Sequence, residues 1–107
     1  MEKLTVSIPH QLTRAEAKRR IQDGIAELRR QHGALLHDLH ETWKGDRMDF
    51  SVAALGMSVA GHLEIQDRAV QVEVALPWLL AQLAASVKQQ IQQQGRQLLS
   101  GPSTNRQ

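Results

Sequence analysis

Histidines and acidic residues gather between residues 32 and 41, where their types and spacing could hold a metal ion. The group comprises His32, His37, Asp38, His40 and Glu41. If the whole stretch is helical, the three histidines could supply the ligands of a tetrahedral zinc site. If residues 39–43 form a strand, His40 turns away from Leu39 and the side chains separate. We favour the strand, so we expect solvated polar side chains and weak or no metal binding.

Basic residues crowd the segment 13–32, which has helical periodicity. They are Arg14, Lys18, Arg19, Arg20, Arg29 and Arg30, and they alternate with the acids Glu16, Asp23 and Glu27. Mixed signs of this kind are typical of a solvated helix face with internal ion pairs. The alternative is a flank that binds phosphate or an anionic surface. Sequence-specific RNA binding would need exposed aromatic residues on the sheet. The chain has only three aromatic residues, so we expect no specific nucleic-acid partner.

Catalytic motifs are absent from the sequence. It contains no G-x-S-x-G, no phosphate-binding loop and no dinucleotide fingerprint. The acids Asp49, Glu64 and Glu73 fall at polar positions of alternating segments, where charges discourage edge pairing of strands. There is no cysteine for thiolate chemistry or disulfides. We therefore predict a protein that is not an enzyme and uses no cofactor.

The apolar run from Leu76 to Ala81 is broader than one helix face can bury. Successive helical residues point 100° apart, so Trp78, Leu79 and Leu80 span about 200° of the surface. A single sheet face covers less than that. We predict an interaction surface at Leu76, Trp78 and Leu79 for a second copy of the chain or an apolar partner. Shielding by the first helix is the alternative.

Alternation of apolar and polar residues predicts five strands, at 3–8, 39–44, 47–55, 57–66 and 69–76. A capping box at Thr13 and Glu16 predicts a helix over 13–32, and Pro77 starts a second over 77–98. Gly45 suits a hairpin turn, and Gly33 suits a helix stop. Gly95 lowers helix propensity, so we expect the last turn of the final helix to fray.

This order, β-α-β-β-β-β-α, predicts an α+β fold. An antiparallel five-stranded sheet is covered by a long C-terminal helix, in a reduced helix-grip-like arrangement with the first strand beside the fifth. The predicted core comprises Ile21, Ile25, Leu28, Phe50, Val52, Val72, Val74, Leu83, Val87 and Ile91.

The length of 107 residues fits a single domain over 1–99, followed by a disordered tail over 100–107. The formal charge is only +2, and residues 74–107 contain no acid. No stretch is apolar enough to span a membrane, and the first residues carry no signal-peptide run. We expect a cytoplasmic protein.

An ordered series of short segments along residues 3–99 resembles a known family. It includes Leu4 to His10, Trp43 to Phe50, Ala54-Leu55-Gly56, Val72-Glu73-Val74 and Leu76 to Ala81. The series is similar to the polyhydroxyalkanoic acid system family, whose members are encoded near genes for polyhydroxyalkanoate storage polyester. The resemblance implies a cytoplasmic, non-enzymatic role at or near the polyester granule, with no catalytic residues to transfer.

Two functional hypotheses follow. The first is an accessory protein that associates with the granule or its proteins through an apolar surface. The second is a small carrier that holds an acyl-type ligand between the C-terminal helix and the sheet, where small residues such as Ala53, Gly56 and Ala60 could leave room. An apolar pocket above about 300 Å³ would favour the carrier. A solid core with exposed Trp78 or Leu79 would favour the interaction protein.

Overall fold

A computed structural model describes residues 2–32, 37–54 and 56–100. Its elements are β1 (Glu2–Pro9), α1 (Arg14–His32), β2 (His37–Lys44), β3 (Arg47–Ala54), β4 (Met57–Ile65), β5 (Ala69–Leu76), the 3₁₀ helix η1 (Trp78–Leu83) and α2 (Ala84–Leu99). The predicted fold class and the order of strands and helices are confirmed. Residues 101–107 of the tail predicted over 100–107 lie outside the described residues, as does the predicted helix stop at Gly33.

The five strands form one antiparallel sheet in the order β1-β5-β4-β3-β2. The predicted pairing of the first strand with the fifth is confirmed. The register aligns apolar residues across the whole sheet, and one such row runs through Val6, Val72, Leu63, Met48 and Trp43. Because side chains alternate along each strand, this register collects the apolar residues on one face and the polar residues on the other.

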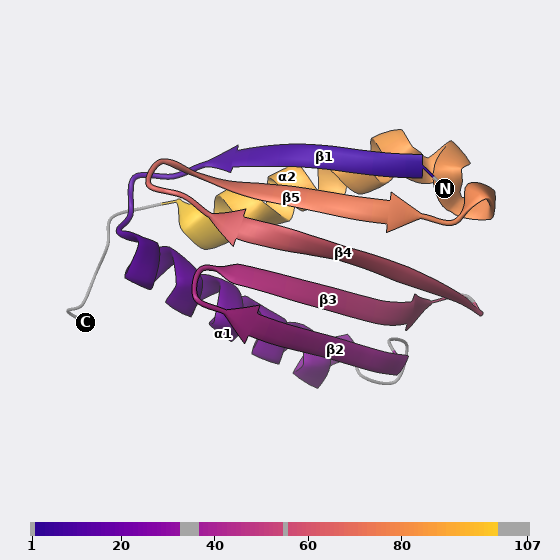
Figure 1. The fold of residues 1–107 in the computed structure, drawn as a ribbon, viewed down its shortest axis with the longest axis horizontal. Coiled ribbons are helices and arrows are strands. Elements are labelled where there is room, and N and C mark those ends of the chain that lie inside the picture. Colours follow the sequence, from indigo (N-terminus) through magenta and orange to yellow (C-terminus); the bar gives the residue numbers. More distant parts are fainter. Residues whose placement is uncertain (1, 33–36, 55, 101–107) are drawn as a thin grey trace.

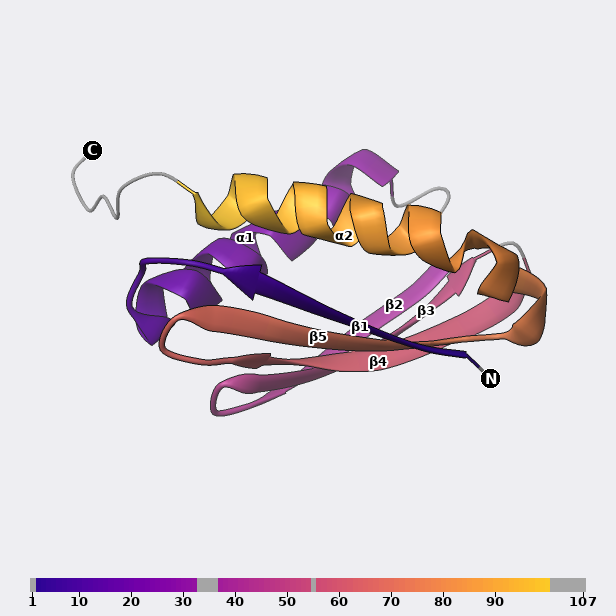
Figure 2. The same cartoon turned by 90° about the horizontal axis from the view of Figure 1, so that it is seen from above.

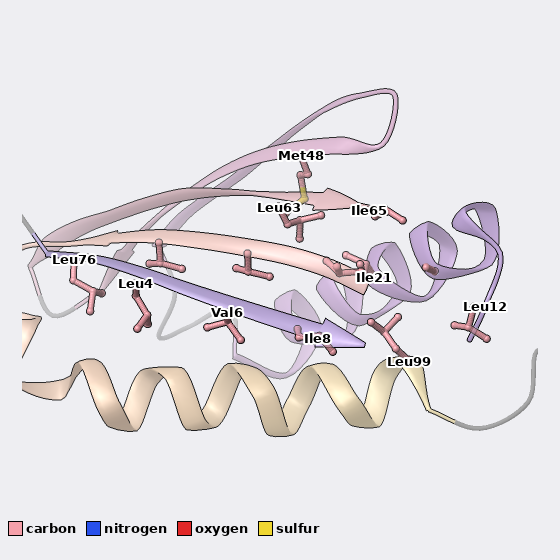
Figure 3. Packing of buried hydrophobic residues seen from close by; sticks show 14 residues of the cluster. Leu4, Val6, Ile8, Leu12, Ile21, Met48, Leu63, Ile65, Leu76 and Leu99 are labelled. Atoms are coloured by element: carbon pink, nitrogen blue, oxygen red, sulfur yellow. The ribbon is translucent and has the colours of Figure 1, made fainter. Parts of the chain in front are cut away.

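Both helices cover the apolar face (Figures 1 and 2). α2 runs along β1 and β5, and α1 lies beside it behind β2 and β3 (Figure 1). Leu4, Val6 and Ile8 of β1 point toward α2 in Figure 3. The buried core comprises Leu4, Val6, Ile8, Leu12, Ala17, Ile21, Met48, Leu63, Ile65, Val70, Val72, Val74, Leu76 and Leu99.

Gly45 and Thr13 have the turn and helix-cap roles that the sequence predicts. Gly45 has φ +60° in the β2–β3 hairpin, a conformation that L side chains rarely adopt. The Thr13 Oγ1 accepts the Glu16 backbone N–H at 3.1 Å, which caps the start of α1. His10 is buried, and nothing in the sequence around it predicts this burial. Its Nδ1 accepts the Leu12 N–H at 3.1 Å and its Nε2 donates to the Gln66 carbonyl at 2.9 Å.

The end of α2 is anchored, so the prediction that it frays at Gly95 is wrong. A Cβ on Gly95 would lie 2.4 Å from the Ile8 Cδ1, so glycine is what allows α2 to approach β1 this closely. Leu99, one turn further on, is buried in the core. Arg20 of α1 donates to the carbonyls of Leu98 and Ser100 and so satisfies the free end of the helix.

The start of the final helix also differs from the prediction, because Trp78–Leu83 forms a 3₁₀ helix before α2 begins.

Two predicted core residues, Leu28 and Leu83, are 39% and 48% exposed, so their assignment to the core is wrong. The helices meet where Leu98 packs on Gly24 and diverge toward the opposite end of the sheet (Figure 1). Their leucines at the diverging end therefore lack a partner helix.

The other predicted core residues fall into a buried group and a half-buried group. Ile21, Val72 and Val74 are buried as predicted. Ile25, Phe50, Val52, Val87 and Ile91 are only half-buried. The sheet is therefore tightly covered along β1 and β5, beneath α2, and only partly covered at Phe50 and Val52 of β3.

Candidate interaction surface

Trp78 and Leu79 form the most exposed apolar pair of the described chain. Trp78 is 72% exposed and Leu79 53%, and Leu83 adds a third exposed side chain from the same 3₁₀ helix. No residue of η1 is buried. We call Trp78, Leu79 and Leu83 the apolar tip.

The geometry of η1 explains this exposure. Pro77 sets an extended backbone with φ −57° and ψ 151°, and its carbonyl accepts the Leu80 N–H at 2.8 Å. A 3₁₀ helix turns 120° per residue, so Trp78, Leu79 and Leu80 point in three directions. Leu80 packs against the core, and the other two side chains then face away from it.

Leu76, the third residue of the predicted surface, is only 2% exposed. It ends the alternating series of β5, in which Val70, Val72 and Val74 also face the helices. Leu76 therefore belongs to the core beneath the tip.

The two ends of the molecule differ in character. Residues 74–87 contain no charge, and they include the whole apolar tip. At the opposite end, where the β2–β3 and β4–β5 turns lie (Figure 1), Arg14 bonds Asp67 at 2.7 Å and Asp46 at 3.2 Å. The pKa of the Asp67 carboxyl is lowered by the Arg14 hydrogen bond and charge. The long axis therefore runs from an ion-paired end to the end that carries the apolar tip.

The basic residues of α1 are engaged within the chain. Arg19 and Arg20 both pair with Glu16, and hydrogen bonds from these two side chains lower the Glu16 pKa. Arg30 pairs with Glu27. These contacts agree with the interpretation of a solvated face with internal ion pairs.

Arg29 and Lys18 of α1 contact the edge strand β2 and the turn that follows it. Arg29 bonds the Glu41 carboxylate and the Leu39 carbonyl, both at 2.8 Å. Lys18 donates to the Gly45 carbonyl at 2.9 Å and lies 5.0 Å from the centre of the Trp43 ring. The Trp43 Nε1 donates to Glu41 at 2.9 Å. Of the two tryptophans, Trp43 thus has partners within the chain, whereas Trp78 faces outward.

The candidate metal ligands lie on different elements. His32 ends α1, while His37 and His40 lie in β2, as the strand interpretation requires. The side chains of His32 and His37 lie outside the described part of the chain. Among the described residues, no three histidine or acidic side chains come close enough to hold a metal ion. Weak or no metal binding stays a prediction.

The predicted polar acids lie on the open face of the sheet. His62 stands between Asp49 and Glu73 in the cross-strand register, and its Nε2 lies 3.3 Å from the Glu73 carboxylate. Lys3 reaches the same carboxylate at 3.6 Å, and Arg47 pairs with Asp49 at 3.1 Å. The Lys3–Glu73 pair joins opposite charges on the neighbouring strands β1 and β5, which stabilises a sheet, whereas Arg47 and Asp49 lie on the same strand.

Two open depressions lie on the surface of the described structure, and residues with polar or charged groups make up most of the lining of each. One of about 300 Å³ lies at the ion-paired end and is lined by Arg14, Lys44, Asp46, Arg47, Glu64, Ile65 and Gln66. The other, of about 450 Å³, lies on α2 and is lined by Gln89, Gln92, Gln93, Arg96 and Gln97. Neither lies between the final helix and the sheet, where a carrier would hold its ligand.

None of the described helices is long and apolar enough to cross a membrane. The exposed large apolar residues of the described chain are Leu28, Trp78, Leu79, Leu83 and Leu98.

Comparison with known proteins gives one match. A family model described as "Putative polyhydroxyalkanoic acid system protein" matches residues 4–99, which include every element of the fold apart from the first two residues of β1. No curated protein and no solved structure matches the chain. Because the match covers most of the chain, this protein belongs to the polyhydroxyalkanoic acid system protein family.

Proposed function

We propose that this protein is a non-enzymatic accessory protein of the polyhydroxyalkanoate storage system and works in the cytoplasm. In this proposal it attaches to the polyester granule through the apolar tip. The observation that carries the proposal is the 72% exposure of Trp78 within a segment that has no charge. Tryptophan is favoured at boundaries between water and apolar material, because its ring is buried there while its N–H stays hydrated.

The position of the tip supports a surface contact. It projects from one end of the sheet, so the granule could bury it without opening the core. The ion-paired end would then face the cytoplasm and keep the exposed side of the attached protein polar.

The carrier hypothesis has less support. Neither depression lies between the final helix and the sheet, and polar or charged residues make up most of the lining of both. The half-buried residues Phe50, Val59 and Val87 are the alternative place for a small apolar ligand, yet they pack against the core cluster.

Retention on isolated polyhydroxyalkanoate granules tests the proposal. Trp78→Ser is expected to weaken binding about tenfold or more, because burial of one large apolar side chain contributes roughly 1.5–3 kcal/mol. Leu28→Ser is the matched control, since Leu28 is an exposed leucine on α1, outside the apolar tip. Equal retention of both variants, with folding intact, would refute attachment through the tip.

Tryptophan fluorescence locates the contact independently. In a Trp43→Phe background the emission comes from Trp78 alone, because the chain has two tryptophans. A blue shift on adding granules is expected if the Trp78 ring leaves water. Unchanged emission with the protein bound would place the contact elsewhere.

A further inference from the structure

The outer side of α2 carries a strip of hydrogen-bond donors, which consists of Gln89, Gln92, Gln93, Arg96 and Gln97. The spacings of three and four residues put these side chains on one helix face. All but Gln92 are exposed, and together they line the depression of about 450 Å³. We call these five residues the donor strip.

The donors of this strip are available. Within the described residues, none of these five side chains forms a hydrogen bond or an ion pair with the protein. Each glutamine amide offers two N–H donors beside one carbonyl acceptor, and the Arg96 guanidinium offers five donors and no acceptor. Residues 74–107 contain no aspartate or glutamate, so no carboxylate lies beside the strip in the sequence to consume these donors.

We propose that the donor strip binds the ester carbonyls of a polyester surface. This inference rests on the proposed function and deepens it, because it names the chemical group that the protein recognises. A polyester chain presents an acceptor at every repeat and almost no donors, so a surface of donors without carboxylates complements it. A hydrocarbon surface has no acceptors and would gain nothing from the strip.

Other occupants fit the strip less well. An anionic surface would call for a dense cluster of cations, whereas α2 has only Lys88 and Arg96. A second copy of the chain could pair glutamine with glutamine, which the experiment below detects as a change in mass.

The test compares binding of the full chain to polyhydroxybutyrate particles and to paraffin particles of equal size. Gln89→Glu/Gln93→Glu replaces two donors with acceptors of the same shape. It is expected to weaken binding to polyester about tenfold, since each hydrogen bond contributes on the order of 1 kcal/mol, and to leave binding to paraffin within about twofold. Gln11→Glu/Gln22→Glu is the charge-matched control, at two exposed glutamines outside the donor strip, and should bind both particles like the wild type.

A second variant separates donors from charge. Gln89→Lys/Gln93→Lys keeps donors at both positions and should retain binding to polyester, also in 0.5 M salt, which screens charge effects.

The outcomes distinguish this inference from the proposed function. Equal binding of the Gln89→Glu/Gln93→Glu variant and its control overturns the donor strip, while the apolar tip stands if Trp78→Ser still binds poorly. If the strip variants weaken binding and Trp78→Ser does not, the strip stands and attachment through the tip fails. A lower molecular mass of the Gln89→Glu/Gln93→Glu variant in sedimentation would make the strip a self-association surface and overturn the inference. Absence of wild-type binding to polyester overturns both.

Discussion

Gly95 of α2 lies so close to Ile8 of β1 that an added Cβ would stand 2.4 Å from the Ile8 Cδ1. This contact fixes the distance between the C-terminal helix and the edge strand. It also sets the position of Leu99, which is buried one turn later. A residue that weakens a helix in isolation is therefore what allows this helix to pack.

Gly95→Ala is expected to destabilise the fold by about 1–3 kcal/mol, as overpacked cores do. Helix propensity alone predicts the opposite, a gain of about 1 kcal/mol. Urea denaturation of the variant decides between the two. A stability gain would mean that α2 does not approach β1 as described.

A substitution of Ile8 and a control substitution at Gly24 test the same contact further. Ile8→Val removes the Cδ1 atom, so it should offset part of the cost of Gly95→Ala in a double-mutant cycle. Gly24→Ala is the control, because the atoms nearest to its added Cβ are the ends of the Leu98 side chain, which is 37% exposed and able to shift. Its effect should be near zero or stabilising.

Truncation of Leu99 should cost much more stability than truncation of Leu83, although both residues belong to the C-terminal segment. Leu99→Ala is expected to cost about 2–5 kcal/mol, because the side chain is 3% exposed. Leu83→Ala should cost less than about 1 kcal/mol, because the side chain is 48% exposed. Thermal or chemical denaturation measures both, and a reversed order would contradict the described packing of α2.

The sequence predicts the sheet well because each strand carries its own signal. Val70, Val72 and Val74 alternate with polar or small neighbours, and burial of one face requires that period. The covering layer is harder to predict, since the exposure of Leu28 and Leu83 depends on where two helices diverge. From the sequence alone, Gly95 only lowers helix propensity, because its close approach to β1 cannot be seen there.

The sequence likewise predicts only part of the candidate interaction surface. The width of the apolar run predicts that Trp78 or Leu79 faces outward, and both do. Leu76 belongs to two patterns at once, the apolar run and the alternation of β5, and its burial follows the second. The 3₁₀ turn at Trp78–Leu83 has no counterpart in the predicted continuous helix, and it is what directs the tip away from the sheet.

The Arg14–Asp67 contact should be visible in the acid titration of the protein. Arg14 lowers the Asp67 pKa below its ordinary value of 3.8, first by a hydrogen bond and then by its charge. A lowered native pKa stabilises the fold above the unfolded pKa, and the contribution is lost as pH falls through the native value. This loss should occur below about pH 4.

Arg14→Gln is expected to return the Asp67 pKa toward 3.8, as followed by NMR of the carboxyl carbon. Arg30→Gln removes an ion pair with Glu27 and should leave the Asp67 titration unchanged. An Asp67 titration that is the same in Arg14→Gln as in the wild type would show that the contact does not persist in solution.

Zinc is expected to bind weakly or not at all, because His32 and His37 lie on separate elements. Titration calorimetry on the purified chain is the measurement. Sub-micromolar affinity that disappears in His40→Ala would require these histidines to converge, and it would overturn the strand-based interpretation.

Fractionation of cells with and without polyhydroxyalkanoate granules tests the central claim most directly. The native protein should sediment with the granules when polymer accumulates and should stay in the soluble fraction when polymer synthesis is blocked. Trp78→Ser, expressed at the same level, should shift toward the soluble fraction in polymer-containing cells. If the native protein stays soluble whether or not granules are present, the proposed attachment to the storage polyester is wrong.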